Sequence, residues 1–343
     1  MMKQSMTVES PLLKVSGESP LLKVDDLTVG FADRRGFLLA ANRVSFSVPK
    51  DHTLGVVGES GCGKSVTLRS LLGLVPYPGE VIAGSIMWMG RDLRTLSKKE
   101  LERIRGKDIS MIFQDPTSCL NPVFSVGDQI TEMLRMKLHM SRQKAFNRAV
   151  ELLDRVGIPS PKQRLADYPH QLSGGMRQRV MIAIAIASQP KLLLADEPTT
   201  ALDVTIQDQI LSLLAEIREE TGMSMILVSH DVGVVAQNAD EVAVMYAGWL
   251  VERGAAREVL HGPRHPYTQG LLNAIPKIDQ VGQRNPLVPI QGQPPNLANL
   301  PQGCPFQPRC PFVNERCYSV LMELDRQEPE HGSTCPFMDG EGA

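Results

Sequence analysis

A glycine-rich segment at residues 58–65 constrains the fold more than any other part of the sequence. It reads GESGCGKS and matches the phosphate-binding loop pattern G-x-x-x-x-G-K-[ST] at every fixed position. The apolar run before it, residues 53–57, predicts a buried strand, and residues 66–72 after it predict a helix. In this order the glycines let the backbone wind around an anion, and the N–H groups at the helix N-terminus point at it. The segment therefore predicts a nucleotide site.

The residues of this loop have separate expected roles. Lys64 is expected to reach the β- and γ-phosphates, and the Ser65 hydroxyl is expected to bind Mg²⁺. The residues expected to line the nucleotide are Gly58, Glu59, Ser60, Gly61, Cys62, Gly63, Lys64, Ser65 and Val66. An aromatic residue before the loop, Phe31, is expected to stack on the adenine ring, with Phe37 and ordinary core packing as alternatives.

Polar side chains follow three further apolar runs that predict buried strands. Residues 109–113 precede Gln114, residues 191–195 precede Asp196 and Glu197, and residues 225–229 precede His230. The carboxyl ends of strands in α/β sheets are where ligands bind. Gln114 is expected to contact Mg²⁺ or position the attacking water, and Asp196 to hold Mg²⁺. Glu197 is expected to polarise that water, with His230 bridging this carboxylate and the γ-phosphate.

A second anion site is predicted at residues 173–175, where Ser173, Gly174 and Gly175 open a helix that runs to about residue 188. Ser173 suits a helix N-cap, and the two glycines leave the helix N-terminus unobstructed. A single nucleotide does not need two such sites. This one is therefore expected to serve a nucleotide that a different subunit holds.

Two other regions differ in periodicity from the buried strands. Residues 44–48 alternate with period two, and residues 84–90 look similar, which predicts an antiparallel β portion. Residues 126–157 have helical periodicity in two amphipathic segments, which predicts an inserted helical subdomain.

The whole-chain composition is that of an ordinary globular protein. The 343 residues carry a net charge of −2 without basic runs, which argues against general binding to nucleic acid. No apolar run approaches the roughly 18 residues of a membrane-spanning helix. Because the N-terminus also lacks the pattern of a signal peptide, the protein is expected in the cytoplasm.

The N-terminal end contains a repeat. The sequence ESPLLKV occurs at residues 9–15 and again at residues 18–24, and only the second copy leads into a predicted strand. Residues 1–18 are therefore expected to be a disordered extension, with an extra edge strand as the alternative.

The C-terminal end, after residue 262, is rich in proline, glycine and asparagine and shows little periodicity. It contains Cys304, Cys310, Cys317 and Cys335, three of them followed by proline. A close C-x₂₋₄-C pair, the usual start of a structural zinc site, is absent from these spacings. An iron–sulfur cluster suits such a loop-rich segment better, and zinc or unligated thiols are the alternatives.

Taken together, these motifs resemble those of ABC transporter ATPase subunits from about residue 20 onward. The similar motifs are the Walker A loop (58–65), the Q-loop residue Gln114, the signature (172–176), Walker B (192–197), the D-loop (201–203) and the H-loop residue His230. The tail, with PRHPYT at residues 263–268 and its cysteines, resembles the extension of dipeptide and oligopeptide transporter ATPases, and within them the D-type subunits of dipeptide permeases. The sequence departs from the family pattern at two positions: Met176 ends the signature where glutamine is commoner, and Thr200 precedes the D-loop where serine is usual. Neither change removes a phosphate ligand or the general base.

This resemblance implies an α/β P-loop NTPase (RecA-like) core with an antiparallel β subdomain, an inserted helical subdomain and a Cys-rich C-terminal extension. The implied boundaries are residues 19–262 for the nucleotide-binding domain, about 116–176 for its helical subdomain, and 263–343 for the extension. The implied cofactors are ATP, Mg²⁺ and a [4Fe–4S] cluster on the four tail cysteines. Ser173, Gly174, Gly175 and Asp203 are implied to contact the nucleotide of a facing subunit.

The implied partners are two transmembrane permease subunits, a second related ATPase and, indirectly, an extracytoplasmic solute-binding protein, on the cytoplasmic face of a bacterial inner membrane. A heterodimer of ATPases is expected, and a homodimer is the alternative. The implied activity is ATP hydrolysis coupled to import of dipeptides or oligopeptides. Nickel or glutathione import, a soluble ABC ATPase without transport, and regulation through the cluster's redox state are the alternatives.

Overall fold

The computed structural model describes residues 19–33, 36–200, 202–274, 289–324 and 331–336, so the first copy of the ESPLLKV repeat lies outside the described residues. Within them the strands form two sheets. The larger sheet has the order β11 (His331–Ser333), β10 (Trp249–Ala255), β9 (Glu241–Tyr246), β3 (Thr53–Val57), β8 (Ser224–Ser229), β7 (Leu192–Asp196) and β6 (Ile109–Ile112). The smaller sheet has the order β2 (Gly36–Val48), β1 (Leu22–Asp33), β4 (Gly79–Trp88) and β5 (Arg91–Asp92).

The centre of the larger sheet is parallel, from β9 through β3, β8 and β7 to β6. Every residue of β3, β7 and β8 is buried, which explains why these strands are continuous apolar runs in the sequence. Parallel pairing brings the carboxyl ends of these strands to one edge of the sheet. The loops that leave this edge hold the predicted site residues.

The smaller sheet is antiparallel and lies beside helix α1 (Lys64–Leu71). Its strand β1 pairs with β2 on one side and with β4 on the other, over longer stretches than the sequence pattern predicts. Apolar residues of β1 and β2, such as Leu22 and Val48, form one core with the apolar face of α1 and with one face of the larger sheet. The predicted antiparallel portion is therefore packed against the phosphate loop's own helix.

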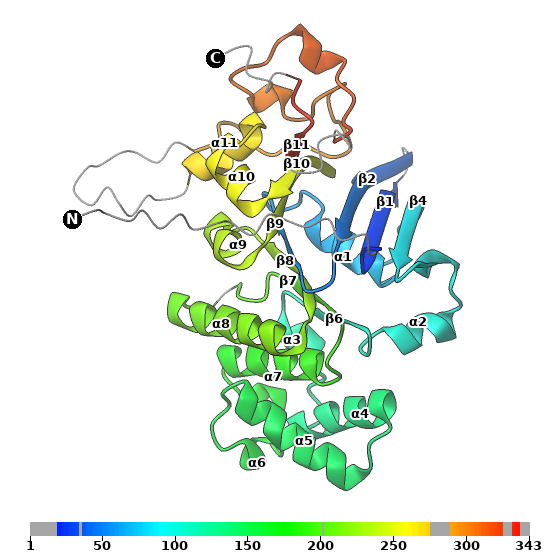
Figure 1. Cartoon of the computed structure of the whole chain (residues 1–343), viewed down its shortest axis with the longest axis vertical. Helices are drawn as coiled ribbons and strands as arrows, with labels where there is room; N and C mark the ends of the chain where they lie inside the picture. Colours follow the sequence, from blue (N-terminus) through cyan, green and yellow to red (C-terminus); the bar gives the residue numbers. More distant parts are fainter. Residues whose placement is uncertain (1–18, 34–35, 201, 275–288, 325–330, 337–343) are drawn as a thin grey trace, which may run out of the picture.

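Helices fill the chain between β6 and β7. They are α3 (Pro116–Cys119), α4 (Val126–Leu138), α5 (Arg142–Arg155), α6 (Pro161–Arg164) and α7 (Gly174–Ile186). Ser125 and Ser141 accept hydrogen bonds from backbone N–H groups and so cap α4 and α5 at their starts. The apolar faces of α4, α5 and α7 share a core with α8 (Val204–Thr221). These helices lie at one end of the long axis of the molecule (Figure 1).

The remaining helices are α2 (Lys98–Ile104), α9 (Val232–Asn238), α10 (Ala256–His261) and α11 (Pro266–Asn273). The C-terminal segments lie at the other end of the long axis, next to β10 (Figure 1). They share a core with the larger sheet, because Tyr267, Phe306 and Cys317 pack in one cluster with Val57 and Tyr246. The expectation of a loop-rich tail without periodicity missed α11 and β11, which are short.

A buried carboxylate ties this extension to the sheet. The side chain of Glu252 in β10 is fully buried, and it accepts hydrogen bonds from the backbone N–H groups of Arg264 (2.6 Å) and His265 (2.9 Å). The His331 ring Nε2 lies 2.6 Å from the same carboxylate. Glu252 therefore joins β10 to the nearby residues 264–265 and to the more distant strand β11, which pairs with the edge of β10.

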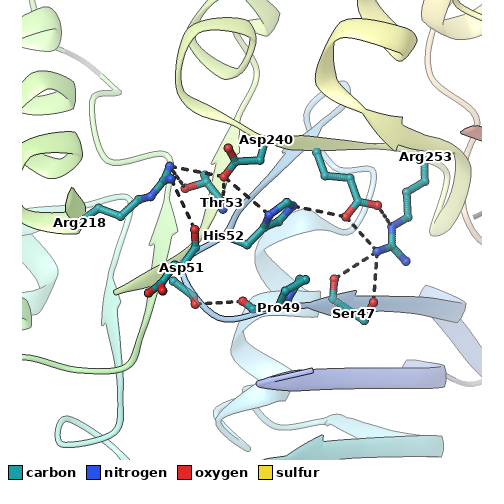
Figure 2. Close-up of polar contacts among 10 residues, drawn as sticks. Ser47, Pro49, Asp51, His52, Thr53, Arg218, Asp240 and Arg253 are labelled. Atoms are coloured by element: carbon teal, nitrogen blue, oxygen red, sulfur yellow. Dashed lines mark hydrogen bonds and ion pairs between the residues drawn. The ribbon is translucent and has the colours of Figure 1, made fainter. Parts of the chain in front are cut away.

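A polar network fixes the opposite end of the parallel strands, where they begin (Figure 2). Asp240, just before β9, accepts a 2.8 Å hydrogen bond from the Thr53 N–H. Arg218 of α8 lies 3.4 Å from the Asp240 carboxylate and donates to the Thr53 hydroxyl at 3.0 Å. These contacts hold the starts of β3 and β9 together, so the site at the other end is built on strands of fixed register.

Candidate nucleotide site

The phosphate loop connects β3 to α1 as the sequence predicts. Lys64, the first residue of α1, is only 4 % exposed. Its Nζ donates to the carbonyl oxygens of Gly58 (2.7 Å) and Glu59 (3.0 Å) and lies 3.8 Å from the Cys62 Sγ. Burial raises the pKa of the Cys62 thiol, and the charge of Lys64 opposes that rise. The ammonium group is thus held at the loop's own backbone, where a phosphate bound in the loop would meet it.

At two positions of this loop, backbone from other segments lies so close that only glycine fits. Gly58 and Gly63 have φ values of +154° and +108°, a region that favours glycine. A Cβ at Gly58 would lie 2.2 Å from the Met245 carbonyl oxygen, and one at Gly63 would lie 2.1 Å from that of Ala40. A Cβ at Gly61 would meet nothing within 4 Å, so that part of the loop faces open space.

The structure brings Ser65 and Asp196 together. The Ser65 hydroxyl donates to Asp196 Oδ1 at 2.8 Å, and the Asp196 residue is fully buried. Burial raises the pKa of this carboxyl, and the Ser65 hydrogen bond and the charge of Arg69 oppose the rise. Its second oxygen, Oδ2, is buried without a hydrogen-bond partner among the described residues. An unpartnered buried oxygen beside a hydroxyl suits a hard cation with oxygen ligands, so these two residues fit Mg²⁺.

Glu197 is the centre of the second group of predicted residues. Three side chains converge on its Oε2: the Gln114 amide at 3.1 Å, the Thr200 hydroxyl at 2.7 Å and the His230 Nδ1 at 3.2 Å. The backbone of Glu197 has φ +47°, and its N–H donates to the Val228 carbonyl oxygen at 3.0 Å. The loops after β6, β7 and β8 therefore meet at a single carboxylate that is 12 % exposed.

Sequence reasoning predicted three of these four residues and missed the fourth. Thr200 stood out only as a departure from the usual serine, and its hydroxyl now proves to hold Glu197. Gln114 lies against Glu197, and no described contact joins it to Ser65 or Asp196. Both roles that the sequence allowed for Gln114, contact with Mg²⁺ and positioning of the attacking water, stay predictions.

The residues predicted to act on a facing subunit lie at exposed helix starts. Ser173 caps α7 and accepts a 3.3 Å hydrogen bond from the Met176 N–H. A Cβ at Gly174 would meet nothing within 4 Å, and one at Gly175 would meet only Ile206, at 3.5 Å. Asp203 caps α8 and accepts from the Ile206 N–H at 3.0 Å. Both helix starts thus face solvent in the single chain; Ala201 of the same connection lies outside the described residues.

Two other predicted residues have plainer surroundings. Phe31 lies on β1, half-buried, opposite Gly79 of β4, and a Cβ at Gly79 would lie 2.6 Å from its ring. Val66, in the first turn of α1, packs against the core between the two sheets. The adenine contact of Phe31 stays a prediction.

The four tail cysteines lie near one another. The Cys304 N–H donates to the Cys317 carbonyl oxygen at 2.9 Å. The pKa of the Cys304 thiol is raised to about 11, mainly by burial and to a smaller extent by the thiols of Cys317, Cys310 and Cys335, while a hydrogen bond from the Phe306 backbone opposes the rise. In the part of the chain that the structure describes, no group of three or more His, Cys, Asp or Glu side chains is arranged to hold a metal ion. The structure thus supports a gathering of thiols and not a finished metal site.

Comparisons with known proteins decide the family. A family model described as "ABC transporter" matches residues 41–200, and one described as "Oligopeptide/dipeptide transporter, C-terminal region" matches residues 251–317. The "Dipeptide transport ATP-binding protein DppD" of Bacillus subtilis is 52 % identical over 320 residues, covering 93 % of this chain and 95 % of that protein. The chain belongs to the peptide-transporter ATP-binding subunits of the ABC family.

Further relatives agree with this assignment. The "Oligopeptide transport ATP-binding protein OppD" of Salmonella typhimurium is 50 % identical over 297 residues, covering 87 % of this chain and 88 % of that one. Among solved structures, the dimeric ABC transporter cassette MJ0796 matches with a TM-score of 0.62 and 28 % identity, covering 69 % of this chain and 99 % of that chain. The same cassette, described as bound to ADP and Pi after hydrolysis, matches with a TM-score of 0.62 and 27 % identity, over the same shares. The site described above is therefore that of an ABC ATPase.

No helix in the described part of the chain is both long and apolar enough to cross a membrane.

Proposed function

We propose that this chain is the ATP-hydrolysing subunit of a membrane importer for dipeptides or oligopeptides. The observation that carries this proposal is the likeness to peptide transport ATP-binding proteins over nearly the whole chain, including the C-terminal region at residues 251–317. The convergence of Gln114, Thr200 and His230 on Glu197 supports hydrolysis as its activity.

The proposed chemistry is in-line attack of water on the γ-phosphate of ATP: the water oxygen bonds to the γ-phosphorus as the bond between that phosphorus and the β–γ bridging oxygen breaks, and ADP leaves. Glu197 takes the water's proton, while Gln114 and His230 keep its carboxylate directed at the site. Lys64 moves from the loop carbonyls to the phosphates and neutralises part of their charge. Ser65 and Asp196 would hold Mg²⁺, which supplies charge neutralisation at the phosphate oxygens when bound.

The proposed partner at the nucleotide is a second ATPase subunit, related but not identical. The exposed starts of α7 and α8, with Ser173, Gly174, Gly175 and Asp203, support a site completed across a subunit interface. The helical segment at residues 129–139, together with the loop of Gln114, is proposed to form a groove that receives one of the two permease subunits at the cytoplasmic face of the inner membrane. Peptide would reach those subunits from an extracytoplasmic binding protein.

The tail cysteines Cys304, Cys310, Cys317 and Cys335 are proposed to hold a [4Fe–4S] cluster. Their gathering in one place, with Cys304 and Cys317 buried, supports this proposal. Such a cluster would supply one-electron redox chemistry or cross-linking of the tail. The measurement is the iron content and visible absorption of protein purified without oxygen, with Cys310→Ser as the comparison; an iron-to-protein ratio near zero would remove the cluster.

The importer itself is tested by purifying the tagged chain from solubilised native membranes and identifying the proteins that accompany it. Two multi-span subunits with a second ATPase are the expected result. A peptide-binding protein in the same complex, and loss of labelled dipeptide uptake in a strain carrying Glu197→Gln, would fix the cargo. Recovery with ribosomal or DNA-bound proteins would instead place the chain among ABC ATPases that work without transport.

A further inference from the structure

The cysteine-bearing extension makes a direct contact with the phosphate loop. Arg309, the residue before Cys310, binds the carboxylate of Glu59 through both terminal nitrogens, at 2.6 Å (Nη1–Oε2) and 3.0 Å (Nη2–Oε1). Only 5 % of the Arg309 side chain is exposed, and 24 % of that of Glu59. A two-pronged arginine–carboxylate pair of this kind is among the stronger polar contacts in proteins.

A second contact holds the backbone of the same loop residue. The Glu59 N–H donates to the Tyr267 hydroxyl at 2.8 Å, and the Glu59 carbonyl oxygen is one of the two that accept from Lys64 Nζ. Burial raises the pKa of Tyr267, so this hydroxyl stays protonated. Two residues of the extension therefore fix Glu59: Arg309 binds its side chain and Tyr267 binds its N–H. The Glu59 carbonyl oxygen in turn binds Lys64.

Aromatic rings pack around Arg309 and Tyr267 and make their side chains rigid. The ring of Tyr267 lies 4.5 Å from that of Tyr246 and 5.4 Å from that of Phe306. The Arg309 guanidinium lies over the Tyr246 and Phe306 rings, at 5.9 Å and 6.0 Å from their centres. These three rings belong to the buried core that joins the extension to the sheet. Arg309 and Tyr267 therefore form part of the packed interior, and their geometry does not depend on mobile surface side chains.

The charge of Glu59 explains why such a contact is useful. Glu59 is the only acidic residue of the loop at residues 58–65, and the loop's ligand is a polyphosphate of the same charge sign. A carboxylate without a partner in that position would oppose ligand binding, because like charges at short distance in a partly buried site are screened weakly. A guanidinium in two-pronged contact cancels this charge and fixes the side chain.

We propose that Arg309 and Tyr267 are positioning residues of the ATP site, through which the C-terminal extension sets the charge and conformation of the phosphate loop. Arg309 neutralises Glu59, and Tyr267 holds the loop backbone from which Lys64 is presented. The proposal rests on ATP binding at this loop and goes beyond it, because it gives a part of the extension remote in sequence a role in nucleotide affinity.

The test compares two variants that break the same ion pair from opposite sides. In the full-length protein, Arg309→Met leaves the Glu59 carboxylate unneutralised, whereas Glu59→Gln removes that charge and leaves the guanidinium. Titration with ATP and Mg²⁺ gives the affinity, and steady-state phosphate release gives KM and kcat. Thermal unfolding measures the loss of stability that both variants have in common. Arg148→Met is the matched control, since it breaks a 3.0 Å pair with Glu151 on α5 that does not touch the loop.

The expected changes in ATP affinity have opposite signs. Arg309→Met should raise the KM for ATP about tenfold with kcat changed far less, and Glu59→Gln should leave KM unchanged or lower it. The double variant should return to within a few-fold of wild type. Tyr267→Phe, which removes the acceptor of the Glu59 N–H, should raise KM by about 2- to 10-fold.

A purely structural ion pair gives a different pattern. It predicts that both single variants lose stability and ATP affinity together, and a loss of ATP affinity in Glu59→Gln as large as that in Arg309→Met would overturn the proposal. If Arg309→Met does not fold, Glu59→Gln decides, because a clear weakening of ATP binding in folded Glu59→Gln contradicts charge neutralisation. Wild-type protein that binds no ATP would instead reject the function on which the proposal rests.

Discussion

The replacement Glu197→Gln tests the central group of the site with the smallest change in shape. The amide has nearly the size of the carboxylate, and its carbonyl oxygen can still accept from the Gln114 amide and the Thr200 hydroxyl, now at 3.1 Å and 2.7 Å from Oε2. The amide cannot take a proton from water. Loss of a positioned base lowers the rate by about 10²- to 10⁴-fold, or about 3–5 kcal/mol in the activation barrier.

The assay separates binding from chemistry. Phosphate release under saturating ATP and Mg²⁺ should fall by that factor, while ATP affinity stays at the wild-type level or rises, because one negative charge has left the neighbourhood of the phosphates. Glu220→Gln is the matched control: that carboxylate is 61 % exposed on α8 and pairs with Arg155, so its removal should leave hydrolysis unchanged. Turnover of Glu197→Gln within tenfold of wild type, in folded protein, would refute the role of Glu197 as base.

Three further predictions concern Ser65, His265 and Phe31. Ser65→Ala removes the hydroxyl that lies 2.8 Å from Asp196 Oδ1, so the Mg²⁺ concentration for half-maximal hydrolysis should rise about tenfold or more, measured by titration with Mg²⁺ at saturating ATP. Burial lowers the pKa of His265 from 6.5 to about 3. Below pH 6.5 this side chain therefore binds a proton in the unfolded chain but stays neutral in the folded protein. The free energy of unfolding should therefore fall by about 2 kcal/mol between pH 7.5 and pH 5 through this group, and urea titrations should show this slope reduced in His265→Asn. Phe31→Ala should weaken ATP binding by about 5- to 150-fold if the ring stacks on adenine, and unchanged affinity would assign the ring to packing against Gly79.

Much of the site was predictable because it lies at strand ends. Continuous apolar runs located β3, β7 and β8, and parallel strands bring their carboxyl ends to one edge, so residues following different runs had to meet. The contacts of Gln114 and His230 with Glu197 follow from that geometry. The phosphate loop was predictable for a different reason, since Gly58 and Gly63 are required by clashes with neighbouring backbone and so leave a fixed spacing in the sequence.

The rest depended on tertiary contacts that leave no periodic signal. Thr200 reaches Glu197 through a turn only three residues long. Arg309 stands 250 positions from Glu59, in a segment whose cysteines drew attention to metal binding instead. Helix α11 and strand β11 have eight and three residues, too few for periodicity to distinguish them from loop.

The way Glu252 is buried has a consequence for protein engineering. A recombinant cassette ended at residue 262 would lose the groups that bind this carboxylate in the described part of the chain beyond that point, the N–H groups of Arg264 and His265 and the ring of His331. It would also lose β11 and leave β10 as an open edge, a surface on which other chains can add strands. The truncated protein should therefore aggregate. A fusion partner should be attached beyond residue 336 and not at the apparent domain boundary.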